Sequence, residues 1–336
     1  MSNPDNDRLL SELLADEGGW RLIELPSDRD DHRSCYVETH SGRLYCLRWF
    51  PDSSIDRSGA SYQRLQFLFQ RFACVPQPVR HGLSADRQFQ YLLSRWIRGE
   101  PVRRRLGQYG PQDDYASGID YGLVLRQLHA ADRLIPHQIQ MPPPACGSSD
   151  WSRQTADLLT RAERCGLALP VPDRMISLIR SLAKIWTRHG TAWLHGRPGP
   201  EHGVLTPRSG LVLTGVTGRV TGHPYRDLAA LVLNTGASGS VFLTGVLDSY
   251  FAGAAGSRSY QILRLFIAIE ILWRIERWRA ASPTRTEQQG LLQMIASYQN
   301  FRELIPTWYQ PLPDFGVKEA TSWRYQPGDR FKGGAV

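Results

Sequence analysis

The architecture of this chain follows from residues 193–229, which contain three short stretches: Trp193-Leu-His-Gly-Arg-Pro-Gly-Pro-Glu-His-Gly-Val-Leu205, Leu211-Val-Leu-Thr-Gly215 and Gly222-His-Pro-Tyr-Arg-Asp-Leu-Ala229. They are rich in glycine, proline and histidine, which favour turns and loops. The sequence on both sides instead shows the apolar spacing of helices. These residues therefore predict one insertion of loops and short strands within an otherwise helical region.

Outward from this insertion, residues 99–305 have mostly helical periodicity. The longest apolar run, residues 262–273, is interrupted by Arg264 and Glu270 and is shorter than the ~20 residues a bilayer span needs, so we expect a buried helix and no membrane association. The apolar spacing predicts helices at residues 114–133, 151–166, 172–189, 227–236, 240–253, 260–280 and 286–303.

The first hundred residues have a different pattern. The turn His40-Ser-Gly42 separates two alternating runs and predicts a β-hairpin. Strands are expected at residues 20–25, 34–39, 44–50, 79–83 and 88–96, and helices at 7–15 and 59–73. The prediction is an α+β chain with a β-rich N-lobe (1–98), a helical C-lobe (99–305) holding the loop 193–227, and an extended aromatic and proline-rich tail (306–336).

Composition restricts the class of protein. The chain has 336 residues and 41% apolar residues, which is enough for a large core. Five scattered cysteines without a Cys-x-x-Cys pair indicate reduced thiols and no zinc site. The first residues lack the basic start and apolar block of a secretory signal, so we expect a cytoplasmic protein.

The net charge of +8 comes almost entirely from arginine, since the only lysines are Lys184, Lys318 and Lys332. Arginine pairs well with carboxylates and phosphates, which favours an anionic partner. A GC-rich genome that uses arginine in place of lysine explains the same bias. Because no RNA-recognition signature, Walker loop, Rossmann fingerprint or Gly-x-Ser-x-Gly motif is present, nucleic acid is not an expected partner.

The three stretches resemble the aminoglycoside phosphotransferase and choline-kinase-like family, which has a bilobal protein-kinase-like fold. The family order is His-Gly-Asp, four residues, Asn, a short hairpin ending in a metal-binding Asp, and Gly-Asp-Pro-x-x-Asp-Leu-Ala. The resemblance spans roughly residues 20–280. Supporting matches are Tyr45-Cys-Leu-Arg-Trp49, Val75-Pro-Gln-Pro78, Arg98-Gly-Glu100 and Gly122-Leu-Val-Leu-Arg-Gln-Leu-His129.

The resemblance implies a base and two metal ligands that this chain lacks. The position of the base holds Arg197, and the ligand positions hold His202 and Gly215. If the alignment with the family is shifted by one residue, Thr214 takes the place of Gly215. Neither residue has a carboxylate. Arginine does not accept a proton near neutral pH, and magnesium prefers oxygen ligands, so we expect no bound ATP or magnesium.

The nucleotide-facing lobe supports the same expectation. The loop at residues 27–34 has no glycine for close approach to phosphates, and its three aspartates repel them. Arg48 takes the basic position of the third strand, where its usual glutamate partner is replaced by Tyr62 or Gln63. Arg48, Arg197 and His202 are therefore expected to line a cleft that binds an anionic ligand.

His195 and Asp227 match family positions that form the hydrogen-bonded frame of the loop, and we predict this structural role over a catalytic one. Three alternatives remain. His195, His202 and His223 with Glu201 could hold a metal, although their spacing matches no known ligand motif. Glu201 beside His202 could be a replacement acid and base. Residues 103–105, all arginine, could grip an anion, and a solvated charge run is the other interpretation.

The functional prediction is a catalytically degenerate member of this family, a pseudokinase that binds an anionic small molecule or a peptide, together with a partner enzyme. The resemblance makes bacterial biosynthesis of specialised metabolites or modified peptides a plausible setting. The alternative is an active phosphotransferase, acting on a small molecule or on Ser or Thr of a peptide with ATP and magnesium. Its missing groups would come from non-standard residues, such as the Asp28–Asp31 loop, or from a partner.

Overall fold

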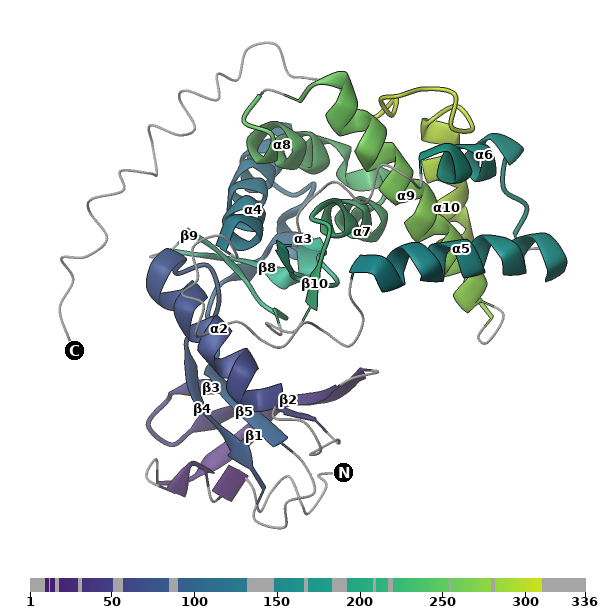
Figure 1. The fold of residues 1–336 in the computed structure, drawn as a ribbon. Helices are drawn as coiled ribbons and strands as arrows, with labels where there is room; N and C mark the ends of the chain where they lie inside the picture. The colour runs from purple at the N-terminus through teal and green to yellow at the C-terminus, as the bar shows by residue number, and fades with distance from the viewer. Residues whose placement is uncertain are drawn as a thin grey trace.

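The computed structural model describes residues 10–11, 13–15, 18–29, 32–50, 57–84, 90–131, 148–165, 169–182, 192–207, 210–216, 220–253, 255–278 and 282–309. The N-terminal strands and one helix form a lower lobe, and most of the helices form an upper lobe (Figure 1). This arrangement confirms the predicted two-lobed α+β architecture.

The N-lobe is an antiparallel sheet with strand order β1-β2-β3-β5-β4. Its central strand β3 is buried on both faces: Leu47 packs in a cluster with Leu10 and Val37, and Phe50 packs with Leu65 and Leu68 of the helix α2. The predicted hairpin is confirmed, with Val37 opposite Tyr45. The elements of this lobe are β1 (Trp20–Arg29), β2 (His32–Thr39), β3 (Leu44–Phe50), α2 (Arg57–Phe72), β4 (Pro78–Leu83) and β5 (Gln90–Arg95).

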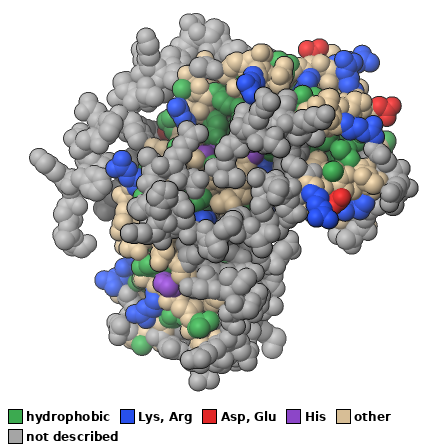
Figure 2. Space-filling model, viewed as in Figure 1, with side chains coloured by type: hydrophobic (Ala, Val, Ile, Leu, Met, Phe, Trp, Pro, Cys, Tyr) green, Lys and Arg blue, Asp and Glu red, His purple; other side chains and the backbone are tan. Residues whose placement is uncertain are grey.

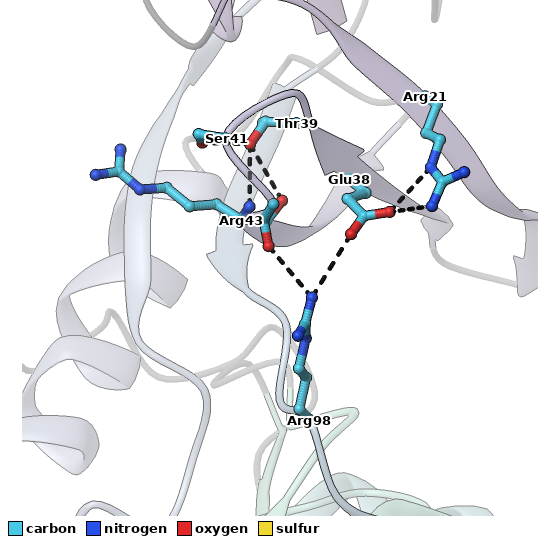
Figure 3. Close-up of polar contacts among 7 residues, drawn as sticks. Arg21, Glu38, Thr39, Ser41, Arg43 and Arg98 are labelled. Carbon is cyan, nitrogen blue, oxygen red and sulfur yellow. Dashed lines mark hydrogen bonds and ion pairs between the residues drawn. The ribbon is translucent and has the colours of Figure 1, made fainter.

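The lobe junction follows β5. Arg98 points back to the N-lobe, where its guanidinium lies 3.5 Å from the Glu38 carboxylate and 3.3 Å from the Gly42 carbonyl oxygen (Figure 3). Arg21 donates to the other oxygen of Glu38. The two arginine side chains are largely exposed, so the contribution of these ion pairs to stability is small. The next residue, Gly99, allows close packing, because a Cβ there would lie 2.3 Å from the Leu205 carbonyl oxygen.

The C-lobe is built around α4, α8 and the buried helix α9. The predicted helices are present, and helix α6 ends at Leu182 within the described residues. The elements are β6 (Glu100–Pro101), α3 (Val102–Arg105), α4 (Pro111–Ala131), α5 (Ser148–Cys165), α6 (Asp173–Leu182), β7 (Ala192–Leu194), η5 (Pro200–His202), β8 (Gly203–Thr206), β9 (Gly210–Leu213), β10 (Val220–Gly222), α7 (Tyr225–Thr235), η6 (Ala237–Gly239), α8 (Ser240–Tyr250), α9 (Ser257–Arg277) and α10 (Arg285–Ser297).

The two lobes also meet away from the junction. The amide of Leu213 in β9 donates to the carbonyl oxygen of Cys74, which follows α2, at 2.8 Å. Arg64 of α2 lies over the ring of Trp193 in β7, with 4.7 Å between the guanidinium carbon and the ring centroid. The strands β7 and β9, which belong to two separate short sheets, therefore contact the N-lobe helix α2 and the residue Cys74 that follows it.

One predicted helix is too long. The pattern indicated residues 286–303, but α10 ends at Ser297, and Gln299, Asn300 and Phe301 have positive φ angles. The cause is packing, because this turn lets Tyr298 and Phe301 stack in the core with ring centroids 5.4 Å apart.

Several predictions concern residues that the structure does not describe. They are the turn after Ser84, at residues 85–87, the side chains of residues 27–33 and the tail beyond Tyr309. Within the described part, Trp308 and Tyr309 pack against the C-lobe core. No helix in that part is long and apolar enough to cross a membrane.

Candidate functional site

The candidate site lies where two short antiparallel pairs, β7 with β10 and β8 with β9, bring residues 195–202 beside residues 213–216. The amide of Thr214 donates to the carbonyl oxygen of His202 at 2.8 Å. The pairing thus gathers the residues that the sequence predicted as site positions: His195, His202 and Gly215.

Asp227 is the fixed point of this loop. Its carboxylate is buried and accepts hydrogen bonds from the amides of His195 at 2.6 Å and Gly196 at 3.0 Å. His129 Nε2 lies 3.0 Å from the same carboxylate, and His129 Nδ1 lies 2.7 Å from the Tyr250 hydroxyl. Burial alone would raise the pKa of Asp227, but the hydrogen bond and charge of His129, together with His195, hold it below its ordinary value.

The rest of the loop is held from the helices behind it. The Tyr121 hydroxyl of α4 donates to the carbonyl oxygen of Gly199 at 3.0 Å. The Asn234 side chain of α7 donates to the carbonyl oxygen of Pro198 at 2.6 Å and accepts from Arg274 at 2.7 Å. Buried backbone groups of an irregular loop need such partners, so the helices impose one conformation on the loop.

His195 has both ring nitrogens engaged. Nε2 lies 2.8 Å from the carbonyl oxygen of Thr214, which can only accept, so Nε2 carries the proton. Nδ1 accepts from the amide of Arg197 at 3.4 Å, a weak bond. These two contacts hold the ring within the loop, and the structural role of His195 stays a prediction.

His202 and Gly215 face each other. The His202 ring is buried, 5.1 Å from the His195 ring between centroids. Gly215 has a φ of +83°, and a Cβ built on it would point at this pair, 3.0 Å from His202 Nδ1 and 3.4 Å from His195 Cε1. A side chain at position 215 would therefore enter the space between the two rings, where the family resemblance places a metal ligand.

The two arginines of the site differ. Arg48 is buried in β3, and its Nη1 donates to the carbonyl oxygen of Val216 at 2.7 Å, so part of this guanidinium holds the backbone beside Gly215. Arg197 is exposed on the loop. Burial lowers the pKa of Arg274, and its interaction with Glu270 acts in the opposite direction. The positive charges of Arg277 and Arg197 lower this pKa further. Arg197 thus adds to the positive potential of this face.

The donors gathered here do not suit magnesium. Asp227 has its oxygens occupied by the frame, and Glu201, half-exposed, approaches His202 Nε2 only to 3.9 Å. Among the described residues, no three His, Cys, Asp or Glu side chains are grouped so as to hold a metal ion. His223 stacks on Phe266 at 4.6 Å between ring centroids. The predicted histidine and glutamate set is therefore not one cluster within those residues.

The order of these elements, with the loop between β7 and β8, the hairpin ending at Gly215 and Asp227 beginning α7, matches a known family. The sequence agrees with the profile of APH, the phosphotransferase enzyme family, over residues 22–266. The chain belongs to this family. A search of curated sequences found no match.

Solved structures of phosphotransferases have the same fold as this family member. They include wild-type aminoglycoside 2'-phosphotransferase-IIIa in complex with GDP (16% identity, TM-score 0.56, 87% of this chain and 96% of that one). The macrolide 2'-phosphotransferase MphH from Brachybacterium faecium is also similar, with 16% identity and a TM-score of 0.54 over 86% of this chain and 97% of that one. The choline kinase LicA from Streptococcus pneumoniae is similar as well, with 13% identity and a TM-score of 0.52 over 87% of this chain and 99% of that one.

Sequence reasoning assigned no role to His129, Tyr121, Asn234 and Arg274, which hold the loop of this phosphotransferase-family chain. Their signal in the sequence is weak, because each is one of several hydrogen-bonding side chains in a helix that buries mostly apolar residues. Of the arginines at 103–105, Arg103 and Arg104 are exposed as expected of a charge run, whereas Arg105 bridges Glu100 and Asp113.

Proposed function

We propose that this family member is a binding protein that does not transfer phosphate, and that its cleft holds an anionic small molecule or a peptide. One observation carries the proposal: the space that a family metal ligand would occupy is bounded by His202, His195 and the bare backbone of Gly215. Phosphoryl transfer depends on positioned magnesium and charge neutralisation, and imidazole with glycine does not provide them.

Charge supports the choice of ligand. Arg197 is exposed at the loop, in the position of the family's base, and Arg48 lies beside Val216. Arginine pairs with carboxylates and phosphates in a fixed geometry. In this proposal a partner enzyme carries out the chemistry on the bound ligand, in a setting such as the biosynthesis of modified peptides or specialised metabolites.

The test is a thermal-shift series on the full chain with ATP and GTP, each with and without magnesium. GTP is included because one structural neighbour was solved with GDP. A ligand at 100 times its Kd stabilises a protein by about 2.7 kcal/mol, which raises Tm by a few degrees. We expect no magnesium-dependent rise. A magnesium-dependent rise of this size, lost in Arg48→Met, would contradict the proposal.

A second candidate is an active phosphotransferase, and the observation in its favour is the half-exposed Glu201 carboxylate, 3.9 Å from His202 Nε2. In this alternative Glu201 serves as the base, and ATP with magnesium is bound. The test is transfer of radiolabelled phosphate from ATP to a panel of small molecules and Ser- or Thr-containing peptides. Loss of transfer in Glu201→Gln, with Asp157→Asn as an exposed control, would establish it. Absence of transfer to the whole panel, with candidate partner proteins added, would exclude it.

A further inference from the structure

The C-lobe has a recess whose lining includes no residue of the loop 193–215. It lies between the start of α6 and the end of α10 and has a volume of about 590 Å³. Its apolar wall includes Val171, Leu292 and Ile295, and its charged rim is formed by Asp173, Arg174 and Arg302. We call this recess the α6/α10 groove. At the end of the C-lobe formed by α5 and α6, basic and acidic side chains lie with apolar ones between them (Figure 2).

The groove carries an excess of unneutralised positive charge. Within the described residues, the side chains of Arg174 and Arg302 form no hydrogen bond and no ion pair, and Asp173 is the one acidic residue of the lining. Arg264 of α9 lies close behind and donates to the carbonyl oxygen of Glu303 at 2.9 Å. Burial lowers its pKa and the positive charge of Arg174 lowers it further, whereas Tyr298 and the charge of Glu303 act in the opposite direction. Three guanidinium groups near one recess repel each other, and a bound carboxylate relieves this repulsion.

The far rim of the groove is preformed. Gln299, Asn300 and Phe301 have φ angles of 47°, 56° and 63°, which residues other than glycine rarely adopt. Backbone hydrogen bonds from Asn300 to Ile295 and from Glu303 to Tyr298 hold this turn. Local strain that the surrounding structure maintains is common at binding sites. Here it places Asn300 and Arg302 at the groove while Phe301 stays in the core.

Leu292 is 44% exposed although it lies beside the buried Ile295. An apolar side chain that enters the groove would remove this surface from water, and flanking carboxylates would meet Arg174 and Arg302. We propose that the α6/α10 groove binds a peptide segment of a partner protein in which an aliphatic or aromatic side chain stands next to carboxylates. The site is separate from the cleft and does not depend on nucleotide binding there.

The probe is a phage-displayed library of random dodecapeptides, selected on the full chain. We expect enrichment of sequences in which Leu, Ile, Phe or Trp adjoins Asp or Glu. Selected peptides are then synthesised with a fluorescent label and measured by anisotropy at low and high salt. Their affinity falls as salt rises, because the rim charges are exposed.

The variants Arg174→Gln and Arg302→Gln each weaken binding by about 2- to 5-fold, and together by about tenfold. Leu292→Ser weakens it without lowering Tm, since this side chain is already half-exposed. The matched control is Arg71→Gln with Arg285→Gln, two exposed arginines of other helix ends, which leaves the affinity unchanged.

Three results would overturn the proposal. The first is enrichment of basic or uncharged peptides, or of peptides whose binding ignores the groove variants. The second is tighter binding of a synthetic peptide of residues 310–336, which would make the occupant this chain's own end. The third is a wild-type dimer in sedimentation that Arg302→Gln dissociates, which would make the occupant a second copy.

Discussion

At the scale of single residues, Asp227 accepts two amide hydrogen bonds from the site loop. A buried carboxylate that accepts two amide hydrogen bonds and contacts His129 ties α7, α4 and the loop together. Removing the charge leaves these donors without an equivalent acceptor in the interior, which is costly.

We predict that Asp227→Asn lowers the free energy of unfolding by about 2 to 5 kcal/mol at pH 7, measured by urea denaturation. The exposed control Asp157→Asn changes it by less than about 0.5 kcal/mol. A loss as small as that of the control would show that the frame does not hold the loop.

The stability difference between the wild type and Asp227→Asn should depend on pH. The folded-state pKa of Asp227 lies below its unfolded value of about 3.9, so the carboxylate stabilises the fold fully above that value. This contribution is lost as pH falls through the folded-state pKa. The difference in the free energy of unfolding between wild type and Asp227→Asn should be constant from pH 8 to 5 and should become smaller below pH ~4. Narrowing entirely above pH 5 would contradict the assignment.

Cys74 gives a second prediction at this scale. Burial raises the pKa of its thiol to about 12, against the opposing effect of its backbone hydrogen bond. At pH 8 only about one thiol in 10,000 is then a thiolate, the reactive form. Iodoacetamide should leave Cys74 unmodified in the native protein and modify it in urea, as read by mass spectrometry of the peptides. Equal modification in both conditions would be evidence against its burial.

At the scale of elements, the closest helix contact is between α4 and α8. A Cβ on Gly118 would lie 2.1 Å from the carbonyl oxygen of Phe242, and one on Gly245 would lie 2.3 Å from that of Tyr115. Backbone oxygens cannot move aside as a side chain can. The helices therefore approach closely only because these positions have no side chain, and this contact sets where Tyr121 and His129 of α4 meet the site loop.

Accordingly, Gly118→Ala should destabilise the protein by about 1 to 3 kcal/mol or more, because the helices must separate. The matched control is Gly290→Ala in α10, where no atom lies within 4 Å of the added Cβ. There alanine should stabilise by about 0.5 to 1 kcal/mol through its helix propensity. Thermal unfolding should show a lower Tm for Gly118→Ala and a higher Tm for Gly290→Ala. A lower Tm for both variants would refute the packing explanation.

At the scale of the whole molecule, one apolar core contains residues of both lobes, and two arginine contacts beside it differ in their exposure to water. Arg48 joins β3 to Val216 in the interior, whereas Arg98 joins the junction to Glu38 and Gly42 with a side chain that is 71% exposed. The first contact is shielded from water and the second is not, so their contributions to stability should differ.

Arg48→Met keeps the length of the side chain and removes its donor, leaving the carbonyl oxygen of the buried Val216 unpaired. We predict a loss of about 1 to 3 kcal/mol in the free energy of unfolding. Arg98→Met should change it by less than about 0.5 kcal/mol. Urea denaturation of the two variants provides the comparison; equal effects would mean that the Arg48 contact does not join the lobes.

Much of the fold was predictable because its signals are local. The hairpin around His40-Ser-Gly42 and most helices followed from turn residues and apolar spacing within about ten residues. The end of α10 was not predictable, since Tyr298 and Phe301 leave the helical path to stack in a core built from distant segments. The positions of the site residues were found by their order along the chain, but their bonding partners were not.

The sequence by itself determined the two-lobed α+β plan, the gathering of His195, His202 and Gly215 at one loop, and the family. Tertiary structure alone decided that Arg48 holds Val216, that the His195 ring contacts the Thr214 carbonyl oxygen and the Arg197 amide, and that Tyr121, Asn234 and His129 hold the loop from behind. The reason is physical: periodicity and turn chemistry act over a few residues, whereas a buried polar group takes whichever partner the packed chain brings within about 3 Å.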